Sequence, residues 1–155
     1  MADFSSSVIS GNTGDAAQLI LELETKLPTR RHATSSTTGV DSNSTTAVEL
    51  LSLSVNGVET DEVLNIIGIS DYGGTVAGDT ARFDIFIGGV SQIWNQSRVP
   101  FAGANTSNSA VVQLSAENLS GNLTVQLMLR RAAGSGTITA ARKSLSVLRT
   151  RKRSS

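Results

Sequence analysis

Apolar and polar residues alternate with a period of two along much of the chain. Residues 19–27 show this most clearly, since Leu19, Leu21, Leu23 and Leu27 share one face while mostly charged residues occupy the other. Such alternation is typical of a half-buried β-strand. The pattern predicts strands at residues 19–27, 47–56, 82–87, 90–99, about 112–117, about 123–130 and 137–149.

Residues 59–70 fit two structures. Val63, Ile66 and Ile67 would share one face of a helix, whereas the apolar run up to Ile69 fits a buried strand. We favour a strand that follows a short turn.

Two dipeptides that contain glycine indicate turns. Asn56-Gly57 follows an alternating segment and predicts a hairpin turn. Gly88-Gly89 lies between two predicted strands and suits a two-residue turn with positive φ.

The last predicted strand contains a conflict of register. Ile138 and Ala140 are even-numbered, whereas Leu145 and Val147 are odd-numbered. One inserted residue within 141–144 would bring all four side chains to the same face, so we predict a β-bulge there.

About eight strands and no convincing amphipathic helix predict the fold class. We expect an all-β protein, an antiparallel β-sandwich of about eight strands with jelly-roll topology. Residues 29–46 are mostly polar and are expected to be a long loop or an irregular edge segment, and residues 100–109 are expected to be a loop. The expected organisation is an N-terminal arm at 1–17, the jelly-roll domain at 18–148 and a basic C-terminal tail at 149–155.

Composition argues against an enzyme. About a quarter of the 155 residues are Ser or Thr, charged residues make up only 17%, and His32 is the single histidine. Catalysis usually needs titratable groups poised near neutral pH, and no nucleophile elbow accompanies His32. We therefore expect no catalytic residues, no metal site and no cofactor. No apolar run approaches the roughly 18 residues that a membrane-spanning helix needs.

The formal net charge of zero hides two opposite halves. Residues 1–78 carry ten acidic and three basic side chains, and residues 79–155 carry three acidic and ten basic ones. Zero net charge argues against a whole-surface nucleic-acid binder, so contact with nucleic acid is possible but not favoured. A local anchor is still compatible with it, and the candidates for docking on an acidic protein surface or another polyanion are Arg149, Arg151, Lys152 and Arg153.

Aromatic residues indicate a contact surface. Phe86 points away from Phe83, Ile85 and Ile87, so both faces of the 82–87 strand carry apolar side chains. One face would cover the sandwich core, and an exposed apolar second face would suit another subunit. The candidates for this interface are Phe86, Trp94 and Phe101.

Four stretches in the second half of the chain carry a family resemblance. They are AGDTARFDIFIGGV at 77–90, LSGNLTVQ at 119–126, GSGTIT at 134–139 and SLSVL at 144–148. Together they resemble the tumour-necrosis-factor-like jelly rolls of bacteriophage virion proteins, over about residues 77–149. The chain departs from that pattern at its end, where the last strand continues into RTRKRSS.

The resemblance implies a homotrimer of jelly-roll subunits. It suggests a capsid decoration, or cement, protein that docks on the major capsid protein, on the exterior of the capsid, after synthesis in the host cytoplasm. No membrane contact is expected. Two alternatives stay open: a tail-fibre or head-fibre module that binds a receptor or glycan, and a minor coat protein whose basic tail contacts nucleic acid.

Overall fold

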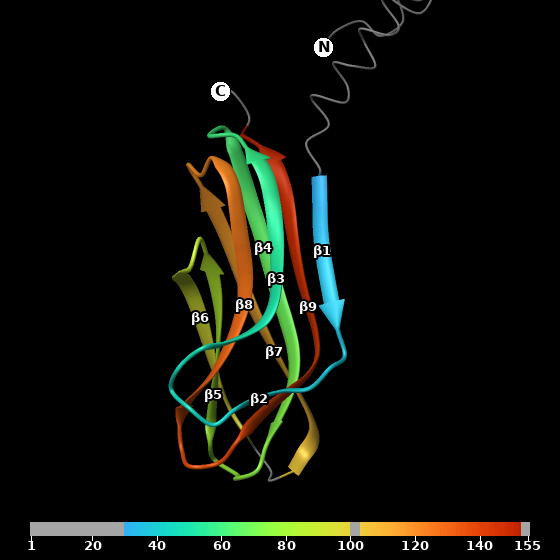
Figure 1. Ribbon diagram of the computed structural model, residues 1–155, viewed down its shortest axis with the longest axis vertical. Helices are drawn as coiled ribbons and strands as arrows, with labels where there is room; N and C mark the ends of the chain where they lie inside the picture. Colours follow the sequence, from blue (N-terminus) through green and yellow to red (C-terminus); the bar gives the residue numbers. More distant parts are fainter. Residues whose placement is uncertain (1–29, 100–102, 153–155) are drawn as a thin grey trace, which may run out of the picture.

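The computed structural model describes residues 30–99 and 103–152 as nine strands in two antiparallel sheets (Figure 1). One sheet has the order β1-β9-β4-β7, with β2 also paired to β9, and the other has the order β3-β8-β5-β6. The strands are β1 (Arg30–Ser36), β2 (Val40–Ser42), β3 (Val48–Val58), β4 (Glu62–Gly74), β5 (Thr80–Ile87), β6 (Val90–Arg98), β7 (Gly103–Glu117), β8 (Gly121–Ala133) and β9 (Ile138–Arg151).

The strand pairing is nested around one central hairpin. β5 pairs with β6, β4 with β7, β3 with β8, and β1 and β2 with β9. The chain is thus one long antiparallel hairpin wound into a sandwich, which confirms the predicted jelly roll. The central turn is Gly88-Gly89, and its φ angles of 58° and 81° confirm the predicted positive-φ turn.

The core lies between the inward faces of the two sheets. In β5 the alternating residues Phe83, Ile85 and Ile87 are buried, as their spacing predicted. The sheets approach closely at Gly68 of β4, where a Cβ would lie 2.7 Å from a terminal methyl group of Leu127 in β8. The remaining core consists mainly of Val, Leu and Ile side chains from β3, β4, β7, β8 and β9.

The predicted β-bulge in the last strand is confirmed. Ser70 pairs with Lys143 and Tyr72 pairs with Ala140, so β9 has one residue more than β4 over this stretch. The extra residue changes the parity of the inward positions. The inward, buried residues of β9 are Ile138, Ala140, Lys143, Leu145, Val147 and Arg149.

The turn predicted at Asn56-Gly57 is wrong, whereas the strand favoured for residues 59–70 is confirmed as part of β4. β3 continues to Val58 and the chain then crosses to the other sheet, so β3 and β4 form no hairpin. Gly57 instead occupies a register irregularity between Val55 and Val58 with a φ of 62°. A hairpin turn and a β-bulge both favour glycine, because both need a residue with positive φ.

Of the two structures expected for residues 29–46, the irregular edge segment is confirmed and the long loop is wrong. β1 and β2 lie end to end along β9, with a break at residues 37–39, so together they take the place of one edge strand. The loop predicted at 100–109 is shortened, because β7 begins at Gly103. The arm at 1–17 and the strand predicted at 19–27 lie outside the described residues.

Candidate functional site

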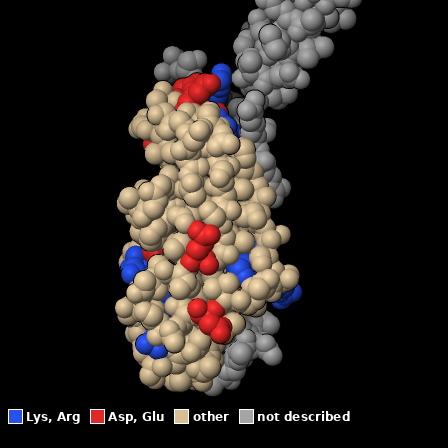
Figure 2. Space-filling model, in the orientation of Figure 1, with Lys and Arg blue, Asp and Glu red and all other residues tan. Residues whose placement is uncertain are grey.

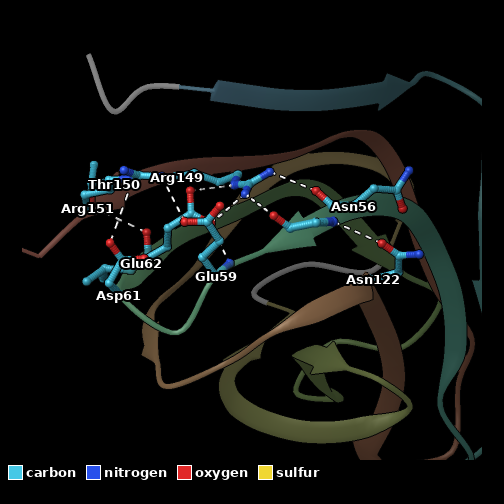
Figure 3. Close-up of polar contacts among 10 residues, drawn as sticks. Asn56, Glu59, Asp61, Glu62, Asn122, Arg149, Thr150 and Arg151 are labelled. Atoms are coloured by element: carbon cyan, nitrogen blue, oxygen red, sulfur yellow. Dashed lines mark hydrogen bonds and ion pairs between the residues drawn. The ribbon is translucent and has the colours of Figure 1, made fainter. Parts of the chain in front are cut away.

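Arg149 is a buried part of the sandwich rather than the start of a free tail. β9 runs on to Arg151, and the Arg149 side chain is only 5% exposed. Its guanidinium lies 2.5 Å from Glu62 Oε2 and also donates to the backbone oxygens of Asn56 (2.9 Å) and Gly57 (2.7 Å) (Figure 3). The expected role of Arg149 in docking is therefore corrected, since all of these partners lie within its own chain.

The carboxylate of Glu62 is held by the same cluster. One oxygen accepts a hydrogen bond from the backbone N–H of Glu59 at 2.8 Å, and both oxygens contact Arg149. Burial alone would raise the pKa of Glu62, but the hydrogen bonds from Arg149 and Glu59, with the positive charges of Arg149 and Arg151, outweigh it. The pKa of Glu62 consequently lies below its ordinary value, and the side chain stays ionised.

The other described tail candidates are also paired within the chain. Arg151 contacts Glu59 at 2.8 Å and Asp61 at 3.9 Å, and Lys152 contacts Glu117 at 3.0 Å. Figure 2 shows acidic and basic side chains gathered at the end of the sandwich where β9 ends. These contacts offset much of the positive charge that the sequence places there. Arg153 lies outside the described residues.

A second polar cluster lies on the outer face of β8, β5 and β6. The pairing register brings Asp84 opposite Trp94 in β6 and Arg82 opposite Arg130 in β8. Phe86 follows on the same face and is half-buried, and the Trp94 side chain is 50% exposed. The structure thus places two of the predicted contact residues on one outer face, while Phe101 lies outside the described residues.

Asp84 is the centre of this cluster and is fully buried beneath its neighbours. Arg82 donates to Asp84 Oδ1 through Nε at 2.9 Å, and its Nη2 lies 2.8 Å from the same oxygen. Ser91 Oγ donates to Oδ1 at 3.3 Å, and the Nε of Arg130 lies 3.5 Å from Oδ2. The guanidinium of Arg82 stacks over the Trp94 ring, 4.4 Å from its centroid, in a cation–π contact.

The residues that the sequence did not identify are Arg82, Asp84 and Arg130. Arg82 and Asp84 alternate with the buried residues of β5, which marks them as outward-facing. Their contact with Arg130 depends on the β5–β8 register, and a pattern along one strand carries no information on that register.

The outer face of the other sheet is apolar at its centre. Ile67 and Ile69 in β4 and Val111 in β7 are among the exposed large apolar side chains, and Ile69 pairs directly with Val111. The β9 residues beside them are Ser144 and Ser146. A surface of small and aliphatic side chains can approach a flat partner closely.

A shallow hollow of about 520 Å³ lies where β1 meets the bulge of β9. It is lined by hydroxyl side chains of residues 35–38 together with Arg142 and Lys143. The ammonium of Lys143 donates to the carbonyl oxygens of Thr38 and Ala141, and burial lowers the pKa of this lysine. Because its donors are directed at backbone oxygens, Lys143 serves the fold here.

The described residues hold neither a metal-type cluster nor a membrane-spanning helix. Within 30–99 and 103–152, no three side chains of the His, Asp or Glu type come together as a metal site requires. His32 lies in β1 opposite Val147. No helix in the same ranges has the length and apolar character to cross a membrane.

Comparison with known proteins supports the fold. No family model and no curated protein matches the sequence. Among solved structures, the chain resembles the VP2 subviral particle of infectious bursal disease virus, with a TM-score of 0.52 and 15% identity over 77% of this chain. The Gt strain of that virus gives a TM-score of 0.53 and 15% identity over 79% of this chain.

The shared architecture is an antiparallel β-sandwich of the jelly-roll kind. The match covers 32% and 33% of those two viral chains, so this chain corresponds to about a third of their length. At this level of identity the likeness concerns the fold.

Proposed function

We propose that the chain is a structural virion protein that decorates a bacteriophage capsid. In this role homotrimers dock on the major capsid protein from outside and act as a cement between shell subunits. The observation that carries the proposal is the nested jelly roll, whose match to a protein of a viral particle spans 77% of the chain.

The surfaces of the sandwich are compatible with this role. Each sheet has an outer face with exposed apolar groups, Ile67 and Ile69 on one and Trp94 on the other. A cement protein needs at least two contact surfaces, one for its own copies and one for the shell. A rigid sandwich with a face on each side supplies both.

The direct test is to locate the protein in particles. Particles are purified on a density gradient from cells that carry the gene, examined by mass spectrometry and labelled with immunogold against this chain. We expect the chain to sediment with intact particles and to be labelled on their exterior. Its absence from particles, when the free protein is abundant in the same cells, would refute the proposal.

The oligomeric state is tested separately by native mass spectrometry at micromolar concentration, where we expect a trimer. A monomer both in solution and after release from particles would refute the trimer. If the trimer is found, its loss in the variant Ile67→Ser/Ile69→Ser would show that the apolar face of β4 mediates self-association.

The half-exposed Trp94 keeps a glycan-binding module as a second candidate, since aromatic rings form apolar platforms with a polar edge. Binding on a glycan array that is lost in Trp94→Ala would favour that function. The nucleic-acid alternative loses support, because Arg149, Arg151 and Lys152 all have acidic partners within the chain. Salt-dependent DNA binding abolished by Arg151→Gln/Lys152→Gln would restore it.

A further inference from the structure

Arg82 and Arg130 form a cross-strand pair of like charges. They are register partners across β5 and β8, and both lie on the outer face of the sheet. Like charges directly opposite one another destabilise a sheet. Buried Asp84 counteracts this repulsion by contacting both guanidinium groups, at 2.8 Å and 3.5 Å. Stability alone does not explain this arrangement, because a sheet with apolar residues at these positions is commonly as stable or more stable.

The arrangement holds Arg82 in a fixed position and keeps Arg130 beside it. Arg82 is bound to Asp84 through Nε and Nη2 and is stacked on Trp94, so little of its rotamer freedom remains. Its Nη1, and both Nη atoms of Arg130, have no hydrogen-bond partner among the described residues. Donors that are already ordered lose less entropy when a ligand binds.

The chemistry of these donors fits a carboxylate. Guanidinium groups bind carboxylates through paired, charge-assisted hydrogen bonds. Two arginines and one aspartate leave a local charge of +1. Glu49 lies on the same face in β3 and accepts a hydrogen bond from Gln126; among the described residues it forms no ion pair with either arginine.

Apolar side chains surround the donors. Trp94 is half exposed, and Phe86 and Met128 are half-buried on the same face. Tryptophan and arginine are the residues most enriched at the energetic centres of protein interfaces, where an apolar wall excludes water from the polar contact. A nucleic-acid site would need a longer series of basic groups without acidic neighbours.

We propose that Arg82, Arg130 and Trp94 form a docking site for a carboxylate-bearing loop of a protein partner. The inference rests on the proposed function, in which that partner is the capsid shell protein. Asp84 is the positioning residue of the site, since it binds Arg82 from beneath and lies 3.5 Å from the guanidinium of Arg130. The positive charge of the proposed docking site thus lies on the outer face of β8, β5 and β6.

The single tryptophan of the chain allows a direct test, because Trp94 fluorescence reports only on this site. The probe is a capped hexapeptide of alternating glutamate and glycine, and the matched control peptide has glutamine in place of glutamate. We expect a saturable change of Trp94 emission with the acidic peptide that weakens with salt. The glutamine peptide should produce no change.

The variants identify the groups that bind. Arg82→Gln/Arg130→Gln should weaken binding of the acidic peptide at least about tenfold. The matched control is Arg142→Gln, whose side chain is 73% exposed and pairs with Asp71 on the other sheet; it should bind as the wild type does. If the first variant fails to fold because Asp84 is left unpaired, Arg82→Gln/Asp84→Asn/Arg130→Gln removes all three charges and should show the same loss.

Four results would overturn the inference: no emission change with the acidic peptide, equal binding of the glutamine peptide, undiminished binding in the folded triple variant, or tighter binding of sialyllactose or single-stranded DNA. The assay needs no particle, so a negative result leaves the decoration role intact. Conversely, absence of the chain from particles would refute that role while peptide binding still defines the site.

Discussion

Replacing Arg149 by Met should produce one of the largest losses of stability available in this chain. The substitution leaves the Glu62 carboxylate, 11% exposed, without its main partner, and removes two hydrogen bonds to backbone oxygens. Removing one member of a buried ion pair costs about 3–5 kcal/mol. Because Asn56 and Gly57 are exposed and water can reach their carbonyl groups, we expect about 3 kcal/mol.

Urea unfolding measures this free energy, provided that the slope of the transition is unchanged. For a chain of this size, a loss of about 3 kcal/mol corresponds to a fall in Tm of about 6–12 °C. The matched control is Arg151→Met, whose partly exposed ion pairs with Glu59 and Asp61 should be worth less than about 1 kcal/mol.

The double variant Arg149→Met/Glu62→Met separates the ion pair from the packing around it. It removes the unpaired carboxylate and should recover more than half of the loss. A buried ion pair would not explain the loss if Arg149→Met cost no more than Arg151→Met, or if the double variant were as unstable as the single one.

Three further predictions concern other parts of the fold. The pKa of Glu62 lies below its ordinary value of 4.5, so the stability that its ionised form contributes is complete above about pH 4.5 and is lost as the pH falls through the lowered pKa. Glu62→Gln should therefore reduce the fall in Tm at acid pH, as thermal unfolding at a series of pH values would show. Gly68→Ala should lower stability by about 1–3 kcal/mol through its clash with Leu127, and adding Leu127→Val should restore part of it, as thermal unfolding would show. Asp79→Ala should cost about 1–3 kcal/mol and speed amide exchange at residues 135 and 136, whose N–H groups donate to the Asp79 carboxylate; unchanged exchange would contradict this role.

The strands that cover the core were predictable, because burial of one face imposes a period of two on the sequence. The alternation in β5 and β8 and the bulge in β9 follow from residues that must face one core. The bulge is the clearest case, since Ile138 and Leu145 can face the same core only if one residue is inserted. Arg149 continues the odd-numbered buried series of Leu145 and Val147, so the signal that places it inside was present.

The pattern allowed an edge segment at residues 29–46 but could not predict its pairing. β1 and β2 are mostly polar, and their pairing with β9 is a set of backbone contacts that leaves no apolar stripe. The Asp84 cluster could not be predicted from the sequence for a related reason. Its members share a face only through the register of β5 with β6 and β8, and that register is fixed by the whole sandwich.

The nested pairing also explains where the opposite charges of the two halves of the chain meet. β9 lies directly beside β4, so basic residues of the second half meet acidic residues of the first, as in the contacts of Arg149 with Glu62 and of Arg142 with Asp71. β8, β5 and β6 are different, because all three follow residue 79 and lie side by side without a strand from the acidic half between them. Arg82 and Arg130 therefore share the single carboxylate of Asp84. The same topology that pairs the basic residues at the end of β9 with acidic ones leaves a positive charge on this one face, where a carboxylate from outside can bind.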